Sequence, residues 1–90
     1  MSKPPIRIAN LPNLGPRSQA MLAEVGIESL EQLQSLGAVR AYALVKRNTT
    51  AASLNLLWGI EGALTNQDWK AVARTERLRL LTELELELAR

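Results

Sequence analysis

A chain of 90 residues can build one small domain, and with 47 % apolar side chains but no Phe its core depends on Leu, Ala, Val and Ile, which favours helices. The absence of Cys and His excludes disulfides, thiolate metal sites and cysteine catalysis and removes the commonest general base, so we expect neither an enzyme nor a bound metal or cofactor. The net charge of +2 is too small to indicate nucleic-acid binding by itself, and no apolar run approaches the roughly 20 residues that span a bilayer.

The N-terminal segment, residues 1–10, carries Pro4 and Pro5 and is expected to form an extended arm. It lacks the long apolar stretch of a secretory signal, which predicts a cytoplasmic protein with no membrane partner. We expect one helical domain over residues 11–90, with no small-molecule substrate.

Local signals place two short helices next along the chain. The first is predicted over about residues 16–25, with Gly26 as a left-handed C-cap. Ser29 and Gln32 have the spacing of a capping box, which predicts a second helix over residues 30–36.

The middle of the chain predicts a third helix over residues 38–47 and a fourth over residues 51–65. The fourth is apolar around most of its circumference, so it belongs in the centre of the domain. Asn55, Gly59 and Gly62 form a strip of small residues along it. Each glycine costs the helix roughly 1 kcal/mol against alanine. Close packing of another backbone on this strip explains the glycines better than a binding groove does.

The last stretch, residues 74–89, ends in a strict alternation of Leu and Glu, which alone is a strand pattern. Leu, Glu, Arg and Ala are strong helix formers, so we predict a helix, while a strand over residues 82–89 remains the alternative. Its expected buried seam consists of Leu78, Leu81, Leu84 and Leu88. Leu80 and Leu86 are then partly exposed, which suggests self-association.

A further short helical segment, capped by Asp68, contains Trp69. The sequence therefore predicts an all-α fold, a compact bundle of five to six short helices. No internal repeat is evident.

The turn that opens the first helix is the strongest candidate for a binding site. Gly15 permits unusual backbone angles, and Pro16 has the φ favoured at the first helical position. The free N–H groups and the dipole of a helix start attract phosphate, and Arg17 and Ser18 stand where they could complete such a site. A capped helix start with an exposed arginine is the alternative.

Basic residues are concentrated in the first half of the chain. Residues 38–60 carry Arg40, Lys46 and Arg47 and no acidic residue, so these three are further candidates for phosphate contacts. Lys46 and Arg47 also have an explanation as cations that complement a helix C-terminus.

Three other residues have structural explanations. Glu61, within the apolar fourth helix, is expected to pair with an arginine at the edge of the core. Trp58 and Trp69 are expected in the core rather than as base-stacking platforms, because basic residues are not interleaved with them.

The opening turn, Leu-Pro-Asn-Leu-Gly-Pro-Arg-Ser, together with the helices around it resembles a helix-hairpin-helix motif. Members of that class hold a DNA phosphate with a Gly-x-Gly hairpin and do not read bases. Asn13 takes the place of the first glycine here. The Asn-Leu-Gly form is similar to the C-terminal domain of the bacterial RNA polymerase alpha subunit, over this hairpin alone. That resemblance implies DNA-backbone contacts by Gly15, Arg17 and Ser18.

A wider resemblance, from about Leu11 to Trp69, is to the C-terminal domain of the TfoX (Sxy) family, which is linked to natural competence in bacteria. It rests on separated blocks in the same order, namely LPNLGPRS, VGIESLEQL, LGAVRAY and SLNLLWGIEGAL. The resemblance implies a helical fold of the helix-hairpin-helix or SAM-like kind. The ten residues before Leu11 leave no room for that family's N-terminal domain, so a stand-alone copy is expected.

Two functions follow from the sequence. In the first, the chain is a regulatory domain that binds DNA backbone weakly and without sequence preference through its opening turn. In the second, it is a protein-interaction module that binds a transcription factor or a second copy of itself through its last helix.

Overall fold

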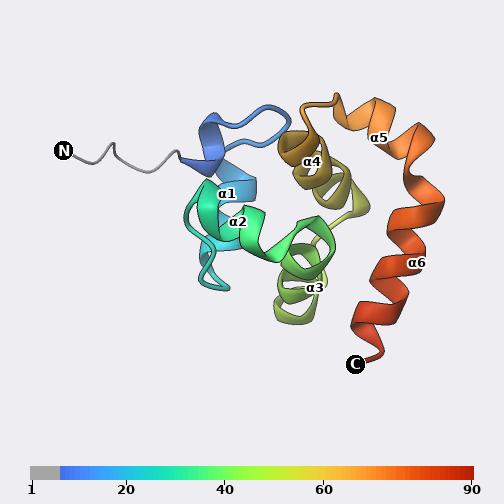
Figure 1. Cartoon of the computed structure of the whole chain (residues 1–90). Coiled ribbons are helices and arrows are strands. Elements are labelled where there is room, and N and C mark those ends of the chain that lie inside the picture. Colours follow the sequence, from blue (N-terminus) through green and yellow to red (C-terminus); the bar gives the residue numbers. More distant parts are fainter. Residues whose placement is uncertain (1–6) are drawn as a thin grey trace.

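The computed structural model describes residues 7–90, and this part of the chain is all-α (Figure 1). A short 3-10 helix, η1, precedes six α-helices. The elements are η1 (Ile8–Asn10), α1 (Pro16–Ala23), α2 (Leu30–Leu36), α3 (Ala38–Asn48), α4 (Leu54–Thr65), α5 (Trp69–Thr75) and α6 (Arg77–Leu88). The predicted all-α bundle is confirmed.

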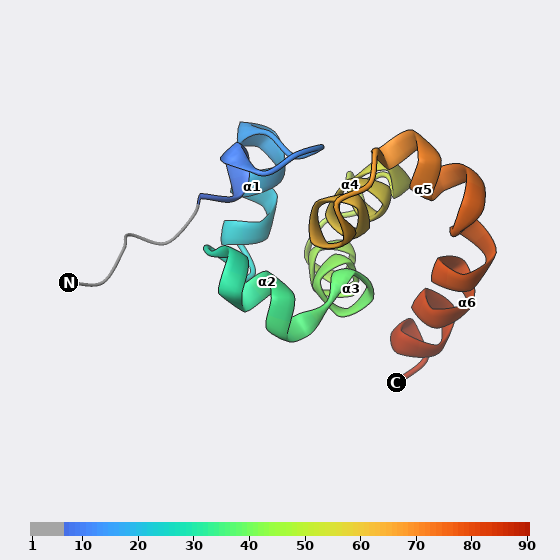
Figure 2. The ribbon, with the colours of Figure 1, turned by 45° about the horizontal axis from the view of Figure 1, so that its top comes forward.

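The helices α3 and α4 pack together in the middle of the domain, with α1 and α2 on one side and α5 and α6 on the other (Figure 2). Leu57, Trp58 and Ile60 of α4 are buried. The central position predicted for this apolar helix is therefore confirmed, and its buried side chains join those of every other helix in one core.

The local signals for α1 and α2 are confirmed. After α1, Gly26 has a φ of +84°, its N–H donates to Ala23 O, and the Ile27 N–H donates to Leu22 O. These two bonds make a Schellman motif. At the start of α2, the Ser29 hydroxyl accepts the Gln32 N–H, and the Gln32 side chain accepts the Ser29 N–H, so the capping box is present.

The glycines of α4 are explained by close packing against the opening turn. A Cβ on Gly59 would stand 3.0 Å from Asn13 O, and a Cβ on Gly62 would stand 2.5 Å from Gln67 O. The prediction that a second backbone packs on this strip is confirmed, because no larger side chain fits between α4 and these two segments.

The alternating tail is helical, as predicted, but its buried face differs from the predicted one. Leu80 is 1 % exposed and Leu84 is buried, whereas Leu78 is 81 % exposed. The expectations that Leu78 and Leu88 lie in the seam and that Leu80 is exposed were therefore wrong; only Leu86, 67 % exposed, lies outside as expected. Residues four apart share a helix face, so Leu80 and Leu84 together form the contact with the core.

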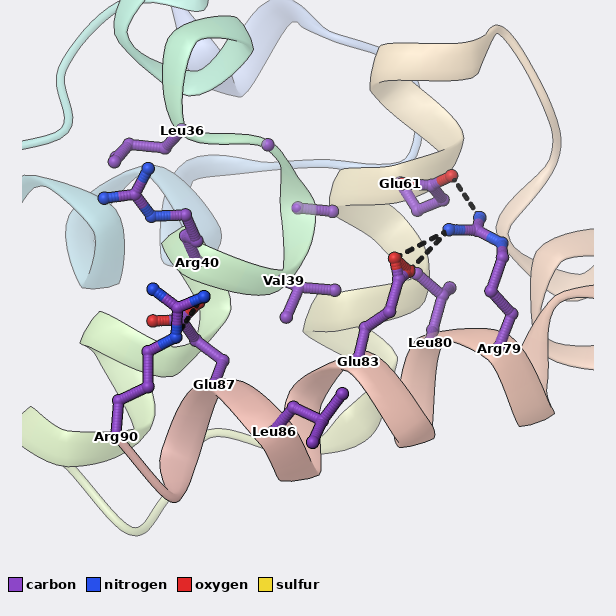
Figure 3. A pocket seen from close by; sticks show the side chains of 12 residues that line it. Leu36, Val39, Arg40, Glu61, Arg79, Leu80, Glu83, Leu86, Glu87 and Arg90 are labelled. Atoms are coloured by element: carbon purple, nitrogen blue, oxygen red, sulfur yellow. Dashed lines mark hydrogen bonds and ion pairs between the residues drawn. The ribbon is translucent and has the colours of Figure 1, made fainter.

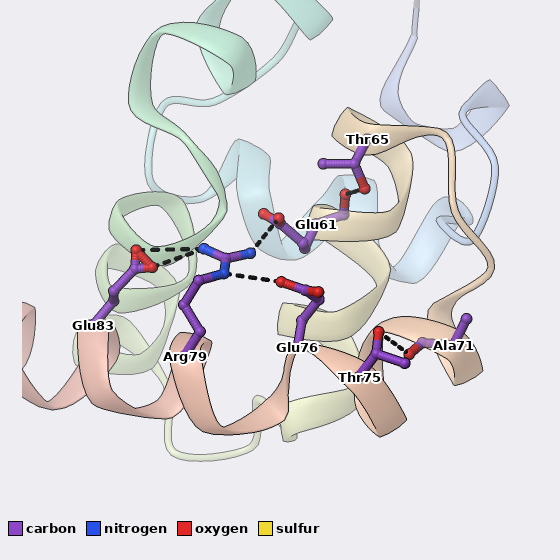
Figure 4. A network of polar contacts seen from close by, with 7 residues as sticks. All are labelled: Glu61, Thr65, Ala71, Thr75, Glu76, Arg79 and Glu83. Carbon is purple, nitrogen blue, oxygen red and sulfur yellow. Dashed lines mark hydrogen bonds and ion pairs between the residues drawn. The ribbon is translucent and has the colours of Figure 1, made fainter.

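An ion-pair network lies beside this buried face of α6 and is compatible with its rotation. Arg79 lies along the edge of α6 that faces α4 (Figure 3). Its guanidinium pairs with Glu61 of α4 at 2.8 Å and with Glu76 and Glu83 at 2.9 and 2.8 Å (Figure 4). The hydrogen bond that Arg79 donates to Glu76 raises the pKa of Arg79, as do the contacts with Glu61 and Glu83, while burial partly offsets this effect. The predicted pairing of Glu61 with an arginine at the edge of the core is confirmed.

Residues 8–10 are more closely tied to the domain than an extended arm would be. Residues 1–6 of the expected arm lie outside the described residues. Ile8 is fully buried within η1, and the Ala9 N–H donates to Gln19 Oε1 of α1 at 2.9 Å. Burial of an isoleucine side chain explains why residues 8–10 pack onto α1.

Candidate nucleic-acid interface

In the turn before α1, Asn13 has an unusual, left-handed backbone conformation. Asn13 has a φ of +69°, in the left-handed region that asparagine tolerates better than most residues. Gly15 is extended, with a φ of −138°, so the special angles expected there were wrong. Pro16 occupies the first position of α1, as predicted. A Cβ at Gly15 would meet nothing within 4 Å, so the fold itself does not require a glycine at this position.

The side chain of Asn13 connects this turn to the segment between α4 and α5. Its Nδ2 donates to Gln67 O at 2.7 Å, and its Oδ1 accepts the N–H of Trp69 at 3.1 Å. Two hydrogen bonds to backbone groups more than fifty residues away hold the turn in one orientation. Asn13 is therefore a positioning residue for the start of α1.

The first turn of α1 presents unused donors. The first backbone bond of the helix runs from the Gln19 N–H to Gly15 O. Within the described part of the chain, the N–H groups of Gly15, Arg17 and Ser18 have no acceptor. The side chain of Arg17 is exposed, and no carboxylate of residues 7–90 lies within ion-pair distance of it. The structure thus brings together three of the predicted site residues, Gly15, Arg17 and Ser18.

Beside these donors lies a groove of about 410 Å³, which we call the Arg17 groove. Its lining is about half polar and half apolar, and the charge it carries is that of Arg17. The residues are Asn13, Arg17, Ser18, Met21, Ala51, Ser53, Asn55, Leu56 and Trp69. A concave surface with a cation and no carboxylate in its lining favours an anionic ligand.

The start of α4 opens into the same groove. Ser53 is the N-cap of α4, its side chain makes no capping bond, and Asn55 is exposed. The N-termini of α1 and α4, each with free N–H groups and partial positive charge, therefore border one groove. Ser53 was not predicted as a groove residue, and for the strip that contains Asn55 close packing was preferred to a groove. A serine directly before the apolar run was the available signal for Ser53.

The other three basic candidates are placed elsewhere. Lys46 Nζ donates to Ala52 O at 3.2 Å and to Thr50 O at 3.4 Å, so it caps the loop after α3. Arg47 donates to Glu87 O of α6 at 2.8 Å. Arg40 is exposed and lies beside α6 with Arg47. The structure does not bring Arg40 and Arg47 to the Arg17 groove.

A second hollow, of about 420 Å³, lies between α6 and the start of α3 (Figure 3). Its charged lining residues are Arg40, Arg79 and Arg90 together with Glu61, Glu83 and Glu87. Arg79 is already paired with two of these carboxylates. The balanced charges make this hollow less suited to an anion than the Arg17 groove.

The two tryptophans differ in their surroundings. Trp58 is buried, as predicted, and the Arg77 guanidinium lies 5.8 Å from its ring centroid. Trp69 is half-buried against the core but also lines the Arg17 groove. Lys70 Nζ lies 5.8 Å from the Trp69 ring, which places a second cation near the groove.

These features define a small all-α domain whose most anion-compatible surface is built on a helix-opening turn. Over residues 7–90, every helix is too short or too polar to cross a membrane. The chain belongs to the family described as the TfoX C-terminal domain, which it matches over residues 5–84.

Comparisons with known proteins agree with this family assignment. The chain is 32 % identical over 78 residues to the DNA transformation protein TfoX of Haemophilus influenzae, covering 87 % of this chain and 36 % of that protein. The chain thus spans about a third of the length of this relative. Two crystal structures of uncharacterised Listeria monocytogenes proteins share the fold. The triclinic form has a TM-score of 0.76 at 23 % identity, covering 83 % of this chain and 85 % of that one. The tetragonal form has a TM-score of 0.75 at 22 % identity, covering 89 % and 98 %.

Proposed function

We propose that this domain serves in the regulation of DNA transformation, and that it contacts nucleic-acid backbone through the Arg17 groove. The family and the name of the Haemophilus influenzae relative support the first part of the proposal. The second part rests on one observation. Arg17 and Ser18 line a groove with no carboxylate in its lining, and the Arg17 side chain has no ion-pair partner within residues 7–90. The backbone N–H groups of both residues and of the adjacent Gly15 have no acceptor within the same residues.

A phosphodiester matches this chemistry. Its oxygens accept hydrogen bonds from backbone N–H groups at a helix start, and its charge is favoured by the helix dipole and by arginine. Extended backbone at Gly15, with open space where a Cβ would stand, lets a phosphate approach the main chain. Pro16 contributes no donor, so the contact depends on the three remaining N–H groups and on Arg17.

The expected binding is weak and independent of base sequence. Contacts to phosphates position a protein on nucleic acid but carry no base information. The groove has one charged lining residue, with Lys70 near Trp69, so few counterions are released on binding. Affinity should fall as salt rises from about 50 to 200 mM, but with a shallow slope.

Fluorescence anisotropy with labelled duplex DNA at low ionic strength tests the proposal. Arg17→Glu should weaken binding about tenfold or more, because it replaces the cation of the groove by a negative charge, which repels phosphate. Arg90→Glu is the matched control, because it makes the same change of net charge at an exposed arginine at the end of α6. The proposal predicts a much smaller loss for the control. Equal losses, or no binding by the native chain, would contradict it.

A further inference from the structure

The outward face of α6 carries two exposed leucines, one on each side of Thr82. Leu78 is 81 % exposed, Leu86 is 67 % exposed, and Thr82 between them is exposed. These residues follow one another at i, i+4 and i+8, on the side of α6 opposite Leu80 and Leu84, which face the core. A row at this spacing is the ridge by which two helices most often cross, with the side chains of each ridge packed into the grooves of the other.

Charge is divided along the same segment. Within α6, residues 77–82 hold two arginines and no acidic residue, whereas residues 83–88 hold three glutamates and no basic residue. Within the described chain, Arg77 and Glu85 form no ion pair. If a second α6 lay antiparallel across the first, the acidic end of each helix would meet the basic end of the other. The two helix dipoles would then point in opposite directions, which is favourable. A parallel arrangement would bring like charges together.

We propose that the chain forms a two-fold symmetric dimer in which two copies of α6 cross antiparallel at Thr82. In this arrangement Leu78 meets Leu86 of the second copy, and Leu86 meets Leu78, because both leucines lie four residues from Thr82. Thr82 has a small side chain at the crossing point, which allows the helices to approach closely. The surface is self-complementary, as a two-fold interface requires.

The length of α6 sets the expected strength. Twelve residues make a helix about 18 Å long, so a single crossing pair buries less surface than a stable dimer of standard size. The dimer should therefore be concentration-dependent, with a dissociation constant on the order of 100 µM. It does not involve the Arg17 groove, so this inference and the proposed function stand or fall separately.

Sedimentation equilibrium across a concentration series tests the association. The native chain should shift from monomer to dimer. Thr82→Arg should weaken dimerisation at least about tenfold, because it places two like charges at the two-fold axis. Gln34→Arg, at an exposed site on α2, adds the same charge and should leave the dimer unchanged. A native chain that stays monomeric throughout, or a Thr82→Arg variant that dimerises as well as the native chain, would overturn the proposal.

Single cysteines test the orientation, because the native chain has no cysteine. Thr82→Cys should form a disulfide-linked dimer rapidly on mild oxidation, and Gln34→Cys should not. Leu78→Cys alone should link slowly, since its two copies lie about 12 Å apart along the helices in the antiparallel pair. A mixture of Leu78→Cys with Leu86→Cys should link rapidly between the two variants. Rapid linking of Leu78→Cys to itself would indicate parallel helices and overturn the antiparallel arrangement.

Discussion

The amide group of Asn13 lies over Gly62 of α4, so that a Cβ on Gly62 would stand only 2.7 Å from Asn13 Nδ2. The same amide donates to Gln67 O and accepts the N–H of Trp69. One polar side chain therefore joins the opening turn, the last turn of α4 and the start of α5. The orientation of Arg17 and Ser18 at the groove depends on this junction, because they begin directly after the turn.

Replacing Asn13 by Ala should destabilise the domain by about 2–3 kcal/mol. The change removes two hydrogen bonds, leaves the half-buried Trp69 N–H without an acceptor, and places a Cβ-only residue at positive φ. Asn66→Ala is a matched control, because Asn66 also has a positive φ, of 58°, but its side chain makes no hydrogen bond within residues 7–90. Urea unfolding should show a loss of only about 1 kcal/mol for the control. Equal losses would show that the Asn13 amide contributes nothing beyond its backbone angle.

Gly62 and Gly15 should respond differently to replacement by alanine. Gly62→Ala should lower the free energy of unfolding by more than about 2 kcal/mol, because a Cβ there collides with Gln67 O despite the better helix propensity of alanine. Gly15→Ala should change it by less than about 1 kcal/mol, since the site is open and its φ is negative. Thermal unfolding followed by circular dichroism measures both. A stable Gly62→Ala variant would refute the close packing of the turn on α4.

The rotation of α6 can be tested with two neighbouring leucines. Leu80→Ala should destabilise the domain by about 2–4 kcal/mol, because the side chain is 1 % exposed and its removal leaves a cavity. Leu78→Ala, at 81 % exposure, should change the stability by less than about 0.5 kcal/mol. The reverse order in urea unfolding would indicate the seam that the sequence pattern predicted. Both variants should be measured at protein concentrations well below the range in which the dimer forms, so that self-association does not affect the comparison.

Tyr42 should make the stability fall at alkaline pH. Burial raises the pKa of its hydroxyl above the ordinary value of 10.0. The folded state thus holds the phenolic proton more tightly than the unfolded chain, and this contribution is complete below pH 10 and is lost as the pH rises through the folded pKa. Tyr42 is the only tyrosine, so tyrosinate absorbance reports its titration directly.

Tyr42→Phe separates this effect from other alkaline changes. The hydroxyl donates to Ala52 O at 3.1 Å, and Lys46 Nζ also reaches that oxygen, so the variant should lose only about 1 kcal/mol at neutral pH. Above pH 10 its stability should fall less steeply than that of the native chain. Parallel alkaline slopes for the two proteins would contradict a raised pKa for Tyr42.

Signals that act within a few residues were sufficient to predict the local structure. Ser29 with Gln32 defined the start of α2, and Gly26 defined the end of α1, because both depend on backbone hydrogen bonds within one turn. The apolar circumference of α4 likewise predicted its central position. The glycine strip predicted close backbone packing, although only the structure identifies Asn13 and Gln67 as the packed segments.

Features that depend on distant segments were not predictable in the same way. Leucines in α6 fit more than one face of a helix, and the buried one is decided by the packing of Leu80 and Leu84 against other helices, with the ion pair from Arg79 to Glu61 of α4 beside it. The Arg17 groove combines the ends of α1 and α4 with Trp69, and no short sequence pattern joins them. The positive φ at Asn13 rather than Gly15 follows from hydrogen bonds to residues more than fifty positions away.

The central claim is that nucleic-acid backbone binds at the start of α1, and backbone amide chemical shifts measured during titration with duplex DNA at low ionic strength test it most directly. The largest shifts should come from the free N–H groups of Gly15, Arg17 and Ser18, with smaller ones from Leu54 and Asn55 at the start of α4. The amide signals of α6 should not shift, and Arg17→Glu should greatly weaken the response. An absence of shifts, or shifts centred on Arg40 and Arg47, would contradict the claim.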